Sequence, residues 1–102
     1  ANLQEQLDLR QIYSESYVAS AHKTTRRLLE ILEQYAGQNV IWITVAGMSN
    51  ALSGVVAGNT TQPVIACPPF SSKEDMMVNI HSTLQCPSNV PVLTVCEIIT
   101  AL

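Results

Sequence analysis

The chain has 102 residues, enough for one domain near the lower end of the sizes that bury an adequate core. Hydrophobic residues make up 47% of it and charged residues only 13%, which excludes a disordered chain and suggests that partners cover part of the surface. The formal net charge of −3, with Arg26-Arg27 as the only adjacent basic pair, argues against a nucleic-acid-binding protein.

The sequence also bears on membrane insertion and on redox chemistry. No apolar run reaches the length that spans a membrane, and the first residues do not resemble a signal peptide. The three cysteines, Cys67, Cys86 and Cys96, show no C-x-x-C spacing, so they suit neither a disulfide framework nor a zinc site. We therefore expect a reduced, cytoplasmic protein that holds no metal.

The first half of the chain predicts a helix, a strand, a second helix and a second strand. Leucines spaced along one helix face predict the first helix, and a short β-rich run predicts the strand after it. The second helix carries an apolar stripe that includes Leu28 and Leu32, and Gly37 suits the position after its end. The second strand is a continuous apolar run, as in a parallel strand covered on both faces. These elements cover residues 2–12, 15–19, 25–36 and 40–45.

The second half predicts a helix, a strand, a helix, a strand and the beginning of a last helix. Ser49 or Asn50 caps the first of these helices, and Pro68-Pro69 stops the strand that follows. Overlapping capping-box patterns in residues 71–75 open the next helix. These five elements cover residues 51–58, 64–67, 73–84, 90–95 and 97–102.

Helices and strands thus alternate along the whole chain. This alternation predicts an α/β fold, a three-layer α/β/α sandwich around a parallel sheet with right-handed crossovers. Residues 1–102 would form a single domain. A domain of this type normally begins with a strand, whereas this chain opens on a helix and closes inside another, so we expect a truncated domain.

Two polar loops follow two successive strands of the predicted sheet. Ser20-Ala21-His22-Lys23 follows the first strand, and Ala46-Gly47-Met48-Ser49-Asn50 follows the second. An open α/β sheet binds its ligands at the carboxyl ends of its strands, so the two loops predict one shared pocket. His22 can take and give a proton near neutral pH, and Lys23 can hold an anion.

The second loop adds backbone donors to this pocket. Gly47 lets the backbone approach a ligand closely, and Ser49 and Asn50 lie where free amides at a helix start favour an anion. Two plainer alternatives remain open from the residues alone. A loop histidine such as His22 more often only hydrogen-bonds the backbone, and the second loop can equally be an ordinary turn.

Four stretches in this order resemble the AIR carboxylase family of purine biosynthesis, and together they span about residues 17–95. The resemblance implies a flavodoxin-like sheet of strand order 2-1-3-4-5. The family's first strand, which is central, and its Gly-Ser-x-Ser-Asp phosphate loop are absent from this chain, so the strand at 15–19 would have no neighbour. The stretches are SAHKT (20–24), VAGMSNALSGVVAGN (45–59), PVIACPP (63–69) and HSTLQCPSNVPVLTV (81–95).

The family has two branches whose loops differ. One rearranges an N5-carboxylated substrate and typically reads SAHR and AGGAAHLPG; the other uses carbon dioxide directly and typically reads SAHK and AGRSNxL. Lys23, Ser49 and Asn50, with Ala51 in place of a second histidine, favour the carbon-dioxide branch. The resemblance therefore implies a carboxy-lyase that carboxylates 5-aminoimidazole ribonucleotide. Met48 stands where this branch usually has arginine.

The resemblance also implies roles for single residues. His22 would move the proton to and from C4 of the imidazole, with no metal or organic cofactor. The rest of the site is implied by position: Ser20, Ala21 and Lys23 would shape the nucleotide and carboxylate pocket, and Ala46, Gly47, Ser49 and Asn50 would bind the imidazole and the carboxylate or carbon dioxide.

Assembly and activity follow from the same resemblance. The family forms octamers with active sites at subunit contacts, so a homo-oligomer is implied. Without the phosphate loop, this chain by itself is not expected to be an efficient enzyme. Three alternatives remain: the N5-carboxy mutase, a relative that carboxylates another heteroaromatic nucleotide, and a non-catalytic assembly or binding subunit, which Met48 favours.

Overall fold

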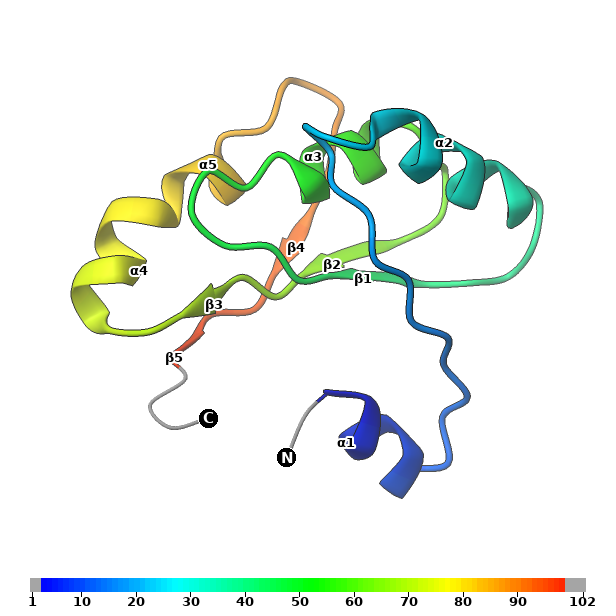
Figure 1. The fold of residues 1–102 in the computed structure, drawn as a ribbon, viewed down its shortest axis with the longest axis horizontal. Helices are drawn as coiled ribbons and strands as arrows, with labels where there is room; N and C mark the ends of the chain where they lie inside the picture. Colours follow the sequence, from blue (N-terminus) through cyan, green and yellow to red (C-terminus); the bar gives the residue numbers. More distant parts are fainter. Residues whose placement is uncertain (1–2, 99–102) are drawn as a thin grey trace.

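A three-stranded parallel sheet forms the centre of the chain in the computed structural model, which describes residues 3–98 (Figure 1). Strands β1 (Trp42–Thr44), β2 (Val64–Ala66) and β4 (Leu93–Thr94) lie in the order β1-β2-β4. The register sets Trp42 beside Val64 and Ile65 beside Leu93. The predicted α/β fold class with a parallel sheet is therefore confirmed, although each strand is shorter than its apolar run.

Helices connect these strands, as parallel pairing requires. Helix α2 (Thr25–Gln34) precedes β1, and α3 (Leu52–Gly58) joins β1 to β2. Between β2 and β4 the chain forms α4 (Lys73–Asn79) and α5 (His81–Leu84). The single helix predicted over 73–84 is thus two helices that meet at Ile80. The predicted cap of α4 is present, because the Ser72 hydroxyl accepts a hydrogen bond from the Asp75 amide at 3.0 Å.

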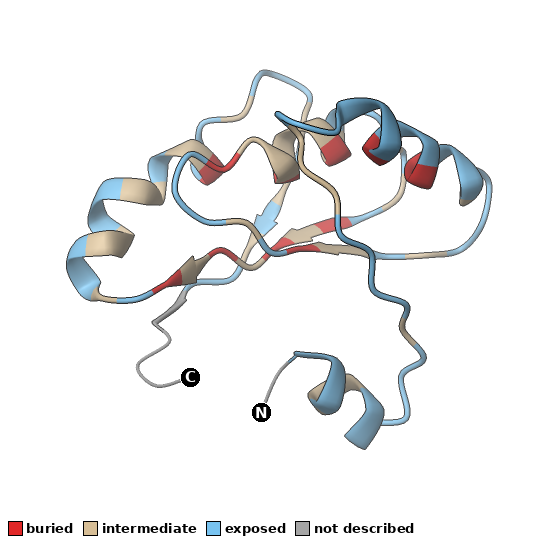
Figure 2. Ribbon diagram, viewed as in Figure 1, coloured by how far each residue is buried: buried red, intermediate tan, exposed pale blue. Residues whose placement is uncertain are grey.

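The hydrophobic core lies between α2, α3 and one face of the sheet (Figure 2). Leu28 and Leu32, one helical turn apart on α2, pack with Val56 of α3 and Val64 of β2. Each of these four side chains is at most 5% exposed. Fully burying a leucine or valine of this kind stabilises the fold by about 2 kcal/mol. This packing fixes α2, which follows the first polar loop, and α3, which follows the second, over the sheet.

The opposite face of the sheet is less covered in the described part of the chain. Side chains alternate along a strand, so Ile43, Ile65 and Leu93, which share a register level, point away from the core cluster. Ile43 and Ile65 are half-buried, and Leu93 is 66% exposed. Helix α1 (Leu3–Leu9) lies on this side in Figure 1 and buries none of its residues. The apolar strand at 40–45 predicts a sheet that is covered on both faces. Within residues 3–98, a packed core lies on one face only.

The strand predicted over 15–19 is wrong. The segment runs from α1 to α2 as irregular chain, and Val18 is 91% exposed. A β-rich run forms a strand only when another strand completes its hydrogen-bond ladder. Among residues 3–98 no strand pairs with this segment. Its β propensity is therefore left without a partner.

The helix predicted from Glu97 is also wrong where the structure describes it. Glu97–Ile98 form strand β5, which pairs in parallel with β3 (Pro69–Phe70). Pro68-Pro69 does end β2 as predicted, but the chain resumes pairing at Pro69. The partner of β5 thus lies far away in sequence, where a local pattern gives no signal. Residues 99–102 of the predicted helix lie outside the described residues.

Candidate active site

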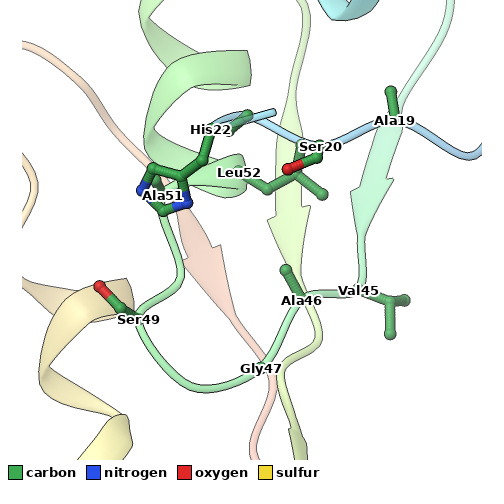
Figure 3. Close-up of a pocket in the computed structure, with 10 residues that line it drawn as sticks. Ala19, Ser20, His22, Val45, Ala46, Gly47, Ser49, Ala51 and Leu52 are labelled. Atoms are coloured by element: carbon green, nitrogen blue, oxygen red, sulfur yellow. The ribbon is translucent and has the colours of Figure 1, made fainter. Parts of the chain in front are cut away.

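The two polar loops form one pocket of about 220 Å³. The first loop precedes α2, and the second joins β1 to α3. The sequence predicts such a shared pocket, and the structure confirms that the loops meet. Figure 3 shows the His22 side chain reaching from the first loop toward the start of α3. The lining residues are Ala19, Ser20, Ala21, His22, Val45, Ala46, Gly47, Ser49, Ala51 and Leu52.

The first loop is held by hydrogen bonds that lead into α2. The Ser20 amide donates to Thr24 Oγ1 at 2.8 Å, and the Thr24 amide donates back to the Ser20 carbonyl at 3.0 Å. The Lys23 amide donates to Ser20 Oγ at 3.1 Å, and Thr25 Oγ1 donates to the Ala21 carbonyl at 2.5 Å. The Ser20 hydroxyl therefore accepts a bond from the loop itself, and its own proton remains for a ligand.

His22 and Lys23 differ in how they meet the pocket. Both side chains are exposed, as expected for loop residues. His22 lines the pocket, whereas Lys23 is not among the lining residues. An exposed imidazole at a pocket wall can exchange protons with both a ligand and water.

The second loop contains a strained residue. Met48 has a φ of 53°, in the left-handed region that residues with a β-carbon rarely adopt, and it is 77% exposed. Such a conformation costs about 1–2 kcal/mol and persists only where neighbouring contacts hold it. Ala46, Gly47 and Ser49 line the pocket on either side of it. The turn at Met48 therefore sets the direction in which Ser49 leaves the loop.

Asn50 is buried and supports the loop from within. Its side chain is 5% exposed, and its Oδ1 accepts bonds from the Leu52 and Ser53 amides at 3.1 and 3.3 Å. Its Nδ2 donates to Thr83 Oγ1 at 2.8 Å and to Ser53 Oγ at 3.2 Å. The N-cap residue of α3 is Ala51, so Asn50 binds the first two amides of the helix from one position earlier than the sequence predicts. Asn50 is not among the residues that line the pocket.

Sequence reasoning missed the contribution of α5. Ser82 and Thr83 both accept hydrogen bonds from Asn50 of the second loop, although they lie 32 and 33 residues after it in the sequence. Their stretch contributes to the family resemblance, yet nothing in it marks the two hydroxyl groups as neighbours of the loop. Only the crossover of the chain through α4 and α5 brings them there. The sequence therefore carries no local signal for this contact.

The described residues show neither a metal cluster nor a membrane helix. Within residues 3–98, no group of three or more histidine, cysteine, aspartate or glutamate side chains is arranged to hold a metal ion. None of the helices described for these residues is long and apolar enough to cross a membrane. The polar groups among the residues that line the pocket are the imidazole of His22, the hydroxyl groups of Ser20 and Ser49, and backbone groups.

Similarity to known proteins identifies the family of this chain. The sequence model of the AIR carboxylase family matches residues 1–100. The chain belongs to the AIR carboxylase family. A phosphoribosylaminoimidazole carboxylase from Archaeoglobus fulgidus is 49% identical over 80 residues, which are 78% of this chain and 44% of that protein. The carboxylase of the same name from Treponema denticola is 39% identical over 82 residues, which are 78% of this chain and 51% of that protein.

The family also includes solved and fused relatives of this chain. The crystal structure of Treponema denticola PurE superposes with a TM-score of 0.83 at 35% identity, covering 92% of this chain and 60% of that chain. A bifunctional carboxylase and succinocarboxamide synthetase from Drosophila melanogaster is 44% identical over 80 residues, 76% of this chain and 18% of that protein. The chain spans about half the length of the two carboxylases it matches. The flavodoxin-like AIR carboxylase fold is thereby confirmed.

Proposed function

We propose that this chain is part of an enzyme of purine biosynthesis that carboxylates 5-aminoimidazole ribonucleotide reversibly with carbon dioxide. The observation that carries the proposal is His22, which lines a pocket between two loops whose sequences resemble those of the family. The product is the 4-carboxy ribonucleotide, and the enzyme is a carboxy-lyase that works without a metal or an organic cofactor.

The proposed reaction needs few parts from the protein. The aminoimidazole ring is an enamine-like nucleophile at C4, so C4 attacks carbon dioxide and a new carbon–carbon bond forms. One carbon–oxygen π pair moves onto oxygen to give the carboxylate, and the C4 proton passes to the imidazole of His22. In the reverse direction, His22 returns this proton to C4. Orientation in a dry pocket and one acid–base group supply the catalysis.

The proposal assigns the other residues of the two loops to binding. Ser20 and Ala21 would contact the nucleotide, and Ser20 retains a hydroxyl proton for this purpose. Ala46 and Gly47 would offer backbone groups to the imidazole, and Ser49 would donate to the carboxylate. Lys23 would act from the rim, and Asn50 would act by shaping the loop rather than by direct contact.

We further propose a cytoplasmic homo-oligomer, an octamer by resemblance, with sites at subunit contacts. The open pocket and the apolar side chains exposed around the sheet favour further contacts for this chain. Leu93, Val45 and Ile41 are 66%, 55% and 62% exposed. Neither nucleic acid nor a membrane is a proposed partner.

Substrate choice tests the proposal and separates it from the mutase alternative. The purified full-length protein of which this chain is part is given aminoimidazole ribonucleotide and bicarbonate, without the ATP-dependent synthetase that makes the N5-carboxylated compound. Formation of the 4-carboxy product supports the carbon-dioxide branch, which Ala51 in place of a histidine favours. Product formed only from the N5-carboxylated compound would identify a mutase instead. Nucleotide binding without turnover of either substrate would identify a non-catalytic relative.

A further inference from the structure

A single hydroxyl group on α5 bridges the backbone of the second loop. The Asn50 amide donates to Ser82 Oγ at 2.9 Å, and the Ser82 hydroxyl lies 3.1 Å from the Met48 carbonyl oxygen. The Asn79 carbonyl, on the preceding turn, is a second acceptor for the same proton at 3.0 Å. Ser82 therefore accepts one bond from the loop and shares its proton between the loop and the last residue of α4.

The two bridged backbone groups enclose one pocket residue. The Met48 carbonyl belongs to the peptide group before Ser49, and the Asn50 amide belongs to the peptide group after it. Holding both peptide groups fixes the backbone of Ser49, which lines the pocket. The bond to the Met48 carbonyl also acts on the residue whose φ of 53° needs support.

Thr83 holds the same loop through a side chain. Thr83 is 1% exposed, and its Oγ1 accepts from Asn50 Nδ2 at 2.8 Å. Asn50 in turn binds the first amides of α3 through Oδ1. The loop is therefore tied to α5 twice, once through its backbone by Ser82 and once through its buried amide side chain by Thr83.

We propose that Ser82 and Thr83 are positioning residues of the active site. Neither lines the pocket, and they act by fixing the peptide groups that flank Ser49 so that its hydroxyl and amide meet the substrate. The identity of the substrate that Ser49 binds rests on the proposed function, whereas the ordering of the loop by Ser82 and Thr83 does not. Loss of these bonds weakens substrate binding and leaves the acid–base chemistry of His22 in place.

The test compares Ser82→Ala with Ser82→Thr, which keeps the hydroxyl, and with Ser88→Ala. Ser88 is exposed in a turn and has no assigned role, so it is a matched serine control. Amide hydrogen exchange at Ser49 and Asn50 is measured in the full chain, together with the kinetics of carboxylation. Ser82→Ala should speed exchange at the Asn50 amide and raise KM, each by about tenfold, the effect of one lost hydrogen bond. Ser82→Thr should reverse both changes, Ser88→Ala should change neither, and the pH profile of kcat should be unaltered.

Unchanged Asn50 exchange in Ser82→Ala overturns the inference, and so does a uniform rise in exchange over the whole chain. If Ser82→Ala does not fold, Thr83→Val serves, because it keeps the shape and removes the acceptor for Asn50 Nδ2. It should give the same local rise in exchange, and its failure to do so overturns the inference as well. Absence of turnover in the unaltered full-length protein counts against the proposed function, while the exchange measurement still decides the role of Ser82.

Discussion

Met48 and Asn50 lie two positions apart in the second loop and have opposite environments. Met48 is exposed and its backbone lies in the left-handed region, while Asn50 is buried and its side chain makes four hydrogen bonds. Local sequence predicts the capping role of Asn50, because asparagine before an apolar helical run is a common cap. It does not predict that Thr83 completes this network. His22 lines the pocket, as the spacing of the two loops predicts.

The exposure of Met48 leads to a prediction at this loop. Met48→Arg should change the free energy of unfolding by less than about 0.5 kcal/mol, because the side chain is 77% exposed. The added cation at the pocket rim should lower KM for the anionic ribonucleotide by about threefold at low salt, and added salt should remove the gain. Steady-state kinetics with Met48→Gln as an uncharged control measures the effect. A higher KM for Met48→Arg than for Met48→Gln would contradict the expectation that a cation at this position attracts the anionic ribonucleotide.

Thr44, at the end of β1, leads to a second prediction at the residue scale. It is 5% exposed, and its Oγ1 has no hydrogen-bond partner among the described residues. A buried hydroxyl without a partner is destabilising, so Thr44→Val, which keeps the shape, should raise the free energy of unfolding by about 1 kcal/mol. Urea unfolding measures this change, with Thr44→Ala as the variant that also removes a methyl group. A clear loss of stability in Thr44→Val would show that the hydroxyl is bonded.

At the scale of elements, a cluster of tyrosines ties the N-terminal segment to the end of α2. The Glu15 carboxylate accepts bonds from the hydroxyls of Tyr13 at 2.5 Å, Tyr17 at 2.9 Å and Tyr35 at 2.6 Å. Tyr35 also packs edge-on against Trp42 at the start of β1, with ring centroids 5.5 Å apart. The segment 15–19, which forms no strand, is thus held by side chains.

The tie at Glu15 should depend on pH. The hydrogen bond from Tyr13, followed by those from Tyr35 and Tyr17, lowers the pKa of Glu15. A lowered pKa in the folded state means that the tie is complete above the ordinary pKa of glutamate, about 4.3, and is lost as pH falls through the lowered value. The protection of the amides of residues 13–18, relative to their intrinsic exchange rates at each pH, should therefore fall at acid pH, while α2 stays protected.

Glu15→Gln tests whether the carboxylate is responsible for this dependence. This variant should show faster exchange over residues 13–18 already at neutral pH and no further acid step. Glu30→Gln, an exposed glutamate on α2, is the matched control and should behave as the unaltered chain. An acid step that persists in Glu15→Gln would assign the pH dependence to another group.

For the whole molecule, the sequence predicts the elements whose signal is local and misses those that depend on distant chain. Apolar runs and helical stripes give β1, β2, β4, α2 and α3 near their observed positions. The pairing of β3 with β5 and the break between α4 and α5 depend on which segments meet in space. The second loop was predictable because it follows a strand of the parallel sheet, and the first because it precedes a strongly amphipathic helix that packs on the same sheet. The supporting hydroxyls of α5 were not.

The one-sided core also gives a prediction for the whole fold. Val64 is 4% exposed and Leu93 is 66% exposed, although both lie in strands of the same sheet. Val64→Ala should lower the free energy of unfolding by about 2 kcal/mol, and Leu93→Thr should lower it by less than about 0.5 kcal/mol. Urea unfolding of the chain measures both. An equally large loss for Leu93→Thr would show that a further layer covers the outer face.

The most direct test of the proposed catalytic role is the pair of measurements on His22→Asn, binding of aminoimidazole ribonucleotide by calorimetry and turnover with bicarbonate. Asparagine keeps a polar side chain of similar reach but cannot carry the proton. In the full-length protein of which this chain is part, we predict that the variant binds the ribonucleotide within about threefold of the unaltered protein and loses about 10²–10⁴-fold in kcat, the usual contribution of one acid–base group. Turnover that survives the substitution within tenfold would contradict the role of His22 as the group that moves the C4 proton.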